Sequence, residues 1–587
     1  MKIAKNKDGK YVKILNSDKS DSFYCICCGN ELQRIFTPMR QYFKHPIGIG
    51  DDCEKKLKNL NLDTEVELTE SDLEILEKHL YNKEFEGMET IMSDYKSEEG
   101  YLMTQEQKDI IFSKEDRVKI EATAGSSKST TLYYYAKERP FKRILYVVYN
   151  ASMKKEAEHT FGKLPNVTIK TLHGLAYGTF GVKYKRKLMQ GSYSARDVMM
   201  DLRMDDIELA VKIKEYFNLF LLSDLKSIDL MYKEFSDDNQ AMEILSGIKR
   251  LFELKKDLTN NVKVEHDFYL KLYHLSQPNL SKYYDVLLLD ESQDSNTLTY
   301  DIIINSGVKG IVMVGDSRQT LYKWRMAINI MNDFEATEYK LSTSFRISNN
   351  VAHLCNLLIN QLGADSKFKI LGFNSENKFV HEVDENEPFV ILCRTNSSIL
   401  ERAFEYISED KKLFFVGGYN GYKFENLLDI FSFKNGRRVN NPLFNKYDSY
   451  RQMIEIAEKS NDVEILILKY MVEKYDEKIP YLINKVKKNT VTDENLADVT
   501  MSTVHKSKGL TIKKNLVIHG DHLDVQDMFE KMYLKSEDVD VEKFLEEIFI
   551  IYVGITRGAR NIKISESLCK YFVSQFKVFE KSINREH

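Results

Sequence analysis

The sequence predicts an α/β protein in which parallel sheets are covered by helices. Short apolar runs rich in β-branched residues alternate with amphipathic helical stretches, the pattern of strands joined by helical crossovers. Three of these runs end directly in polar residues that can contact phosphate, as expected where parallel strands place ligands at their carboxyl ends. A chain of 587 residues is long enough for two or more domains. The predicted strands are 117–123, 143–149, 167–172, 284–291, 310–316, 388–394 and 514–520.

The composition is that of a globular chain. Hydrophobic residues make up 43% and charged residues 30%, which is ordinary for a soluble protein. There is no run of about 18 apolar residues that could span a bilayer, and the N-terminal segment MKIAKNKDGKYVKIL lacks the apolar stretch of a secretory signal. We therefore expect no membrane association and a cytoplasmic location, in a bacterium or in a virus-infected host cell.

The net charge of −4 hides a basic, aromatic segment between residues 142 and 187. It contains ten Lys and Arg against two acidic residues, with Tyr and Phe interleaved. Cations suit a nucleic-acid backbone and ring faces suit unstacked bases, so this mixture favours a groove for single-stranded nucleic acid. A solvated Lys-rich face over a core containing Tyr and Phe fits the composition equally well.

Two mostly helical stretches interrupt the predicted sheets, as insertions would. Between the N-terminal segment and the first sheet lies an acidic run that we expect to be helical and solvated. The predicted boundaries are 1–62 for an N-terminal module, 63–99 for the acidic linker, 100–180 and 276–335 for a first sheet domain, 181–275 for its helical insertion, 336–425 and 496–587 for a second sheet domain, and 426–495 for a reduced helical insertion.

The stretch EATAGSSKSTTL at Glu121–Leu132 nearly spells a phosphate-binding loop. A predicted strand precedes it and a helix can begin after it, so loop amides and the helix dipole would face an anion. Lys128 would meet the β- and γ-phosphates, and Ser129 would ligate Mg²⁺. Ser127 stands where the pattern has glycine, so a chance run of small polar residues is the alternative. The predicted phosphate-binding residues are Ala124, Gly125, Ser126, Ser127, Lys128, Ser129 and Thr130.

A second element, LLLDESQD, ends a predicted buried strand with Asp290 and Glu291. Nucleotide hydrolysis needs a carboxylate that holds the metal and a base beside it, and this strand end would deliver both. Ordinary turn residues are the alternative when the element is taken alone. Together with the loop, the pair of carboxylates predicts a nucleotide hydrolase.

Further motifs follow in order along roughly residues 100–565. They are LMTQEQKDII, LYVVYNASMKKEAE, TIKTLHGLAYGTF, VGDSRQTLYKWRMAIN, LSTSFRIS, MSTVHKSKGLTIK and IYVGITRGAR. In this order they resemble motifs Q, Ia, Ib, III, IV, V and VI of the UvrD/Rep/PcrA group of superfamily 1 DNA helicases, and among these the F-box DNA helicase type most. The resemblance implies two RecA-like domains, ATP with Mg²⁺, and DNA unwinding.

The resemblance also implies roles in ATP binding and hydrolysis. Asp290 supports the metal and Glu291 activates water, while Gln107 reads adenine and Phe345 stacks on it. Thr511 replaces the glutamate that this group typically places near the nucleotide sugar, so hydrolysis or sugar discrimination is expected to differ. Charge on the transferred phosphoryl group is best stabilised by rigid donors from two domains, and the matching residues are Gln293, Gln319, Arg325, Arg346 and Arg557.

For DNA, the resemblance places Trp324, the single tryptophan, against a base of one strand; a core tryptophan is the alternative. The expected activity is an ATP-dependent 3′–5′ translocase and helicase, acting as a monomer on single-stranded DNA and its duplex junctions in replication, recombination or repair. An ATP-gated clamp or recruitment factor and the motor of a helicase–nuclease complex are alternatives, and RNA stays open as a substrate. The residues expected to line the strand are Tyr149, Asn150, Thr171, His173, Thr503 and His505.

Four of the seven cysteines lie within the first 53 residues. The segments CICCGNEL and YFKHPIGIGDDC supply Cys25, Cys28, His45 and Cys53, a set suited to tetrahedral zinc, with Cys27 as a spare thiol or alternative ligand. They resemble the small zinc-binding segment of CoiA-like competence proteins. Reduced cysteines packed in a small domain are the alternative. The module would bind DNA or a replication or recombination protein.

Overall fold

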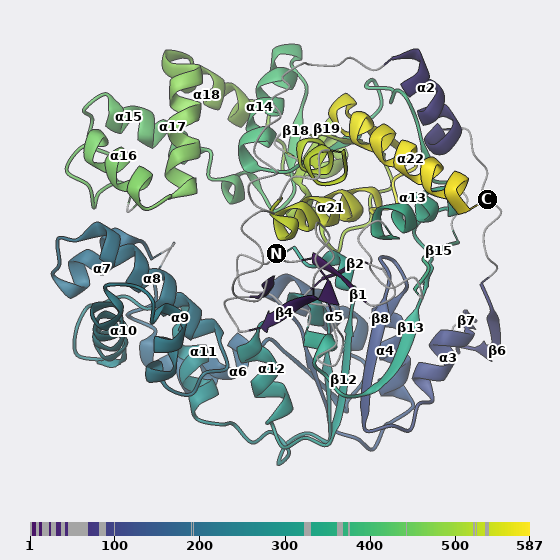
Figure 1. Cartoon of the computed structure of the whole chain (residues 1–587), viewed down its shortest axis with the longest axis horizontal. Helices are drawn as coiled ribbons and strands as arrows, with labels where there is room; N and C mark the ends of the chain where they lie inside the picture. The colour runs from purple at the N-terminus through teal and green to yellow at the C-terminus, as the bar shows by residue number, and fades with distance from the viewer. Residues whose placement is uncertain are drawn as a thin grey trace.

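The structure, a computed structural model, contains two α/β domains, each with a helical insertion (Figure 1). The parts of the chain that it describes are the backbones of five strands within 3–44, and residues 69–81, 90–98, 100–189, 191, 193–321, 330–360, 368–373, 376–441, 443–520, 523, 525–534 and 539–586.

The first domain is a parallel sheet of six strands in the order β10-β9-β11-β12-β8-β13. Its central strands β11 (Val286–Leu289) and β12 (Gly310–Gly315) are buried along their whole length, because helices cover both faces. The other elements are β8 (Arg117–Ala122), β9 (Ile144–Val147), β10 (Val167–Lys170), β13 (Thr337–Leu341), α3 (Gln105–Ile111), α4 (Lys128–Lys137), α5 (Ala151–Phe161), α6 (Leu172–Thr179) and α12 (Thr297–Ile304).

The second domain repeats this plan with the strand order β16-β21-β20-β17-β19-β18, again all parallel. All seven strands predicted from apolar runs are present, five in the first sheet and two in the second. The elements are β16 (Lys378–Phe379), β17 (Phe389–Cys393), β18 (Leu413–Phe415), β19 (Val499–Thr503), β20 (Asn515–Ile518), β21 (Asn561–Ile564), α13 (Asn349–Asn360), α14 (Asn396–Tyr406), α19 (Val504–Ser507), α20 (Val525–Phe529), α21 (Val541–Ile555) and α22 (Glu566–Glu586), with a short parallel pair β14 (Thr343–Ser344) and β15 (Leu371–Gly372).

Two bundles of helices interrupt the sheets and lie beside each other on one side of the molecule (Figure 1). Their helices are amphipathic, as α10 illustrates with Ile244, Ile248 and Leu251 on its buried face. The bundles meet where Lys446 Nζ donates to Ser194 Oγ at 2.7 Å. The helices are α7 (Ala195–Leu202), α8 (Ile207–Leu222), α9 (Tyr232–Phe235), α10 (Ala241–Lys256) and α11 (His266–Leu275), then α15 (Glu425–Lys434), α16 (Tyr450–Lys459), α17 (Val463–Tyr475) and α18 (Ile479–Asn489).

The acidic run 63–99 differs from the solvated helical linker expected. Its helix α2 (Glu70–Leu76) packs against α22 of the second domain, where Lys577 Nζ donates to Asp72 Oδ1 at 2.5 Å. Leu76 and Leu80 are buried in the core of that domain. The run then forms strand β6 (Met92–Lys96), which pairs with β7 (Leu102–Thr104) beside α3. Apolar residues such as Leu76 and Leu80, which lie among the charged residues of this run, explain why its helix is buried against the second domain.

The N-terminal residues form an antiparallel sheet in the order β2-β1-β3-β4-β5. The predicted zinc ligands Cys25, Cys28, His45 and Cys53 lie outside the described residues. Within the part of the chain that the structure describes, every helix is too short or too polar to cross a membrane. The strands are β1 (Ile3–Asn6), β2 (Tyr11–Lys13), β3 (Phe23–Tyr24), β4 (Glu31–Phe36) and β5 (Gln41–Lys44).

Candidate nucleotide site and nucleic-acid interface

The phosphate-binding loop joins β8 to α4, as the sequence predicts. Ser127 adopts a left-handed conformation, with φ 59° and ψ 39°, so it takes the backbone geometry usually given to glycine. Such a conformation costs a non-glycine residue roughly 1–2 kcal/mol. The side-chain oxygen of Ser126 is buried without a hydrogen-bond partner. A buried polar atom of this kind in a phosphate loop indicates a ligand contact.

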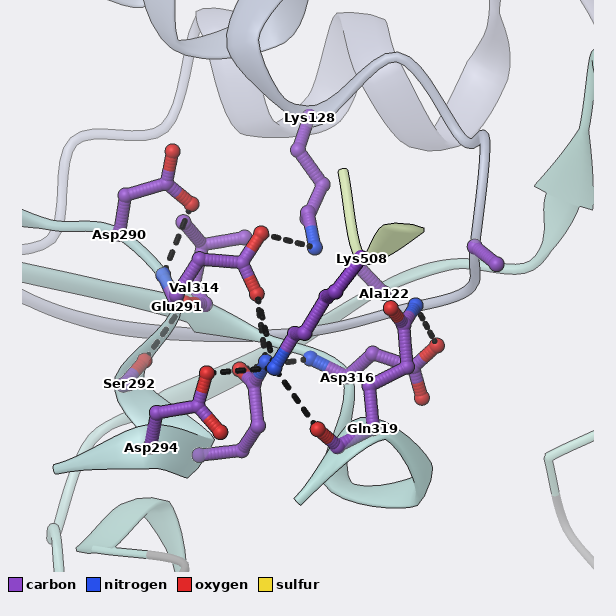
Figure 2. A network of polar contacts seen from close by, with 12 residues as sticks. Ala122, Lys128, Asp290, Glu291, Ser292, Asp294, Val314, Asp316, Gln319 and Lys508 are labelled. Atoms are coloured by element: carbon purple, nitrogen blue, oxygen red, sulfur yellow. Dashed lines mark hydrogen bonds and ion pairs between the residues drawn. The ribbon is translucent and has the colours of Figure 1, made fainter. Parts of the chain in front are cut away.

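Lys128, the first residue of α4, points into a cluster of carboxylates at the ends of β11 and β12 (Figure 2). Its Nζ lies 3.2 Å from Oε1 of Glu291. Glu291 has φ 50°, which turns the chain sharply after the strand. Asp290 immediately precedes it and is 5% exposed. The predicted phosphate cation and the predicted catalytic base are therefore in direct contact.

The two adjacent carboxyl groups differ in acidity. Burial raises the pKa of Asp290, and repulsion from Glu291 adds to this rise. Burial also opposes ionisation of Glu291, but Lys128 and Lys508 outweigh it and lower its pKa to about 2. Although burial alone would lower the pKa of Lys128, Glu291 and Asp290 raise it. Glu291 is consequently ionised at neutral pH, as a proton acceptor must be.

Ser129 and Asp290 fit the role of magnesium ligands. Tyr146 Oη donates to Asp290 Oδ2 at 2.5 Å, and Ser129 lies close enough to this hydroxyl to oppose the rise that burial causes in the pKa of Tyr146. Mg²⁺ favours such oxygen donors and completes its shell with phosphate oxygens and water. In the described residues, no group of three or more His, Cys, Asp or Glu forms a metal site by itself.

The two predicted γ-phosphate contacts are held by buried hydrogen bonds. Gln293 Nε2 donates to Glu291, and its Oε1 accepts from the backbone N–H of Asp316 at 3.1 Å. Gln319 Nε2 donates to Asp316 Oδ2 at 2.8 Å. Both glutamines are buried. Asp316, which the sequence analysis did not single out, thus orients both amides.

Lys508 is a second residue that the motif assignment missed. It follows α19 in the second domain, and its Nζ donates to Asp294 and, at 2.7 Å, to the carbonyl oxygen of Gln319 in the first domain (Figure 2). Glu291 lies 4.0 Å away. The only sequence signal was a cation next to Gly509 within MSTVHKSKGLTIK.

The three predicted arginines have different surroundings. Arg346 lies against the phosphate loop. A Cβ atom added to Gly125 would be only 2.5 Å from the Cβ atom of Arg346. Arg557 is fully buried and donates to the carbonyl oxygens of Val553 and Ser507 at 2.7 and 3.2 Å. Burial and the neighbouring Arg346 lower the pKa of Arg557 to about 9. Arg325 lies outside the described residues.

The predicted adenine contacts both border the segment that contains the phosphate loop and the start of α4. Gln107 is buried; its Oε1 accepts from Thr104 N at 2.9 Å and its Nε2 donates to Thr131 Oγ1 at 3.2 Å. Phe345 donates its backbone N–H to the carbonyl of Gly125 at 2.9 Å, and its ring packs edge-on against another phenylalanine. Gln107 therefore contacts the first turns of α4, and Phe345 contacts the loop itself.

The predicted DNA-contacting residues follow the carboxyl ends of β9, β10 and β19. Asn150, Thr171 and Thr503 cap α5, α6 and α19 through their side-chain oxygens. His173 Nε2 lies 3.0 Å from Oδ1 of Asp267 on α11, a partner that local sequence did not reveal. Burial lowers the pKa of His505 to about 4. Tyr149, which precedes Asn150 in the sequence, is half-buried. Trp324 lies outside the described residues.

The geometry described above can be compared with known proteins. Residues 103–338 match the UvrD/REP helicase N-terminal domain. The chain is 27% identical over 507 residues to F-box DNA helicase 1 of Gallus gallus, covering 79% of this chain and 49% of that protein. It is 25% identical over 537 residues to F-box DNA helicase protein 1 of Schizosaccharomyces pombe, covering 82% and 59%. A shorter match, 30% over 119 residues and 17% of each chain, is to the ATP-dependent DNA helicase Rep of Escherichia coli.

These comparisons confirm the predicted similarity to UvrD-like DNA helicases. The chain spans about half to three-fifths of the length of the two F-box relatives. The predicted CoiA-like segment precedes the residues that match the helicase domain.

Proposed function

We propose that the chain is an ATP-dependent motor that moves 3′ to 5′ along single-stranded DNA and unwinds duplex DNA. The observation that carries this proposal is the contact of Lys508, from the second domain, with Asp294 and the carbonyl of Gln319 in the first. Because both domains contribute to one cluster of charges, a nucleotide bound in that cluster would change the electrostatic attraction between the two domains. Repeated closing and opening of two domains on a strand gives directed stepping.

Hydrolysis would use groups that already lie together. Lys128 neutralises phosphate charge and Glu291 accepts the proton of the attacking water. The two side chains are paired at 3.2 Å, so an entering phosphate would draw Lys128 away and free the carboxylate for water. Mg²⁺ held by Ser129 and Asp290 would add positive charge beside the phosphates. Arg346 supplies a cation from the second domain.

The DNA strand would lie across the carboxyl ends of both sheets. Asn150 and Thr171 cap α5 and α6 there, and the first-turn amides that such caps do not use bind phosphates without reading base sequence. Thr503 caps the short helix α19 at the end of β19. The contact of Lys446 with Ser194 would close the side of this path between the helical bundles. This arrangement favours a strand over a compact ligand.

Steady-state ATPase with and without single-stranded DNA tests the proposal. We expect strong stimulation with many turnovers, and unwinding of duplexes with a 3′ tail in preference to a 5′ tail. Lys128→Ala should abolish both activities, whereas Lys137→Ala on the same helix should keep them. A single turnover without DNA stimulation would favour an ATP-gated clamp instead.

We propose in addition that Cys25, Cys28, His45 and Cys53 bind one zinc ion, and that the chain acts as a monomer at junctions of single-stranded and duplex DNA. Metal analysis of the intact protein should find one zinc per chain, and Cys28→Ser should lose it. Cys393→Ala, in the buried strand β17, should retain the metal. Intact protein without zinc would end the metal assignment.

A further inference from the structure

Tyr552 reaches from the core of the second domain into the nucleotide site of the first. It lies on α21, within the motif IYVGITRGAR, and is fully buried. Its ring belongs to the apolar core of the second domain. Its hydroxyl group, however, bonds to Asp316, Thr123 and Ala124, which lie at the ends of β12 and β8 in the first domain.

The geometry fixes the direction of these bonds. Tyr552 Oη donates its proton to Asp316 Oδ2 at 2.9 Å. It therefore accepts from Thr123 Oγ1 at 3.2 Å and from the backbone N–H of Ala124 at 3.4 Å. Burial and the nearby Asp316 raise the pKa of Tyr552, so the hydroxyl remains a donor at neutral pH. One hydroxyl thus joins the phosphate loop to Asp316.

Asp316 is the carboxylate that orients Gln319. Its Oδ2 accepts from Gln319 Nε2 at 2.8 Å, and its Oδ1 accepts from Arg318 Nε at 2.7 Å. Although burial alone would raise the pKa of Asp316, Arg318 and Lys128 lower it, so the group is ionised. The same oxygen, Oδ2, accepts from Gln319 and from Tyr552.

We propose that Tyr552 is a positioning residue, through which the second domain holds Asp316 and thereby sets the side chain of Gln319 against the γ-phosphate. This inference rests on the proposed ATP hydrolysis. The contact exists only when the two domains are close together, since the ring is anchored in one and the acceptor lies in the other. Separation of the domains releases Gln319 from its hydrolytic position.

Tyr552→Phe tests the proposal because it removes the hydroxyl and keeps the ring. The matched control is Tyr571→Phe, which removes a hydroxyl that is also fully buried in the second domain but accepts from Gln575 on its own helix. Measurements are kcat and KM for ATP at saturating single-stranded DNA, and the melting temperature. We expect kcat of Tyr552→Phe to fall about tenfold to a hundredfold with KM within about twofold, as displacement of a positioned group does.

The control should lower the melting temperature by a comparable amount and keep kcat. Equal kcat values for Tyr552→Phe and Tyr571→Phe would overturn the positioning role. Adding Tyr552→Phe to Asp316→Asn should cost much less than Tyr552→Phe costs alone, because the two groups act through one bond; independent losses would also overturn it. Wild-type protein without DNA-stimulated ATPase would instead refute the proposed function.

Discussion

In the first domain two charged groups of the nucleotide site pair with each other, whereas two polar side chains of the second domain reach across to partners in the first. Lys128 and Glu291 come from two segments of one sheet and lie 3.2 Å apart. Lys508 and Tyr552 instead bond to Asp294 and Asp316 across the domain boundary. The difference teaches that the proposed base and phosphate lysine are held within one domain, while contacts from the other domain reach the residues around them.

Breaking the pair inside the first domain has the largest expected effect. Glu291→Gln removes the proton acceptor and keeps the shape, so ATP hydrolysis should fall about 10²–10⁴-fold while ATP binding remains. Equilibrium binding of a labelled nucleotide and steady-state hydrolysis check this. Glu338→Gln, a surface change on β13, should leave both unaltered. Parallel loss of binding and hydrolysis in Glu291→Gln would contradict the assignment of the base.

The contact of Lys508 with Asp294 makes the domain boundary sensitive to pH. Burial raises the pKa of Asp294 from 3.8 to about 6, with Lys508 opposing. Because the pKa of Asp294 is higher in the folded protein than in the unfolded chain, its protonation stabilises the fold. This contribution, on the order of 3 kcal/mol, is fully present below about pH 4 and is lost as the pH rises through about 6. Asp294→Asn should remove this loss, measured as unfolding free energy against pH.

Asp527→Asn, on the surface of α20, is the control for this titration and should follow the wild-type profile. The ion pair itself needs ionised Asp294, so DNA-stimulated ATPase should weaken as the pH falls below about 6. Superimposable stability profiles for Asp294→Asn and wild type would show that this carboxyl group does not titrate in that window.

A third substitution tests DNA binding instead of nucleotide hydrolysis. If Trp324 stacks on a base, Trp324→Ala should lose roughly 1–3 kcal/mol of single-strand affinity and keep basal ATPase and the melting temperature. Fluorescence anisotropy with labelled DNA checks the affinity. Phe141→Ala is the control, because Phe141 is 96% exposed before the amino end of β9. If Trp324 is instead a core residue, Trp324→Ala leaves a cavity that lowers the free energy of unfolding by about 3–5 kcal/mol. All activities should then fall together.

The smallest expected effect is at the phosphate loop. Ser127→Gly relieves the left-handed strain at φ 59°, but glycine also adds freedom to the unfolded chain, so the gain is at most about 1 kcal/mol. Thermal unfolding should show a small rise in melting temperature. Thr130→Gly, inside α4, should lower it instead, because its backbone is helical. A fall with Ser127→Gly would mean that its side chain is needed.

The strands and the residues at their ends could be predicted because their signals are local. Apolar runs end in Asp290 and Asp316, and the carboxyl ends of parallel strands meet at one edge. The loop keeps its backbone shape without the usual glycine, because Ser127 itself adopts the left-handed conformation.

The contacts between domains could not be predicted in this way. Tyr552 reads as one more apolar position in a buried helix, and only its distance from Asp316 reveals its use. Lys508 is one of several lysines in its segment, and its partner Asp294 is 214 residues away. Such pairings depend on how two folded domains meet, which hydrophobic periodicity does not encode.

The packing of α2 on α22 joins early and late parts of the sequence. Leu76 and Leu80 are buried there, and the ring of His79 stacks on Phe576 at 4.9 Å. Deleting α22 from an expressed fragment would therefore expose apolar surface on α2, and deleting α2 would expose the same surface on α22. Fragments designed to isolate the second domain should keep both helices, joined by a new linker if the first domain is removed.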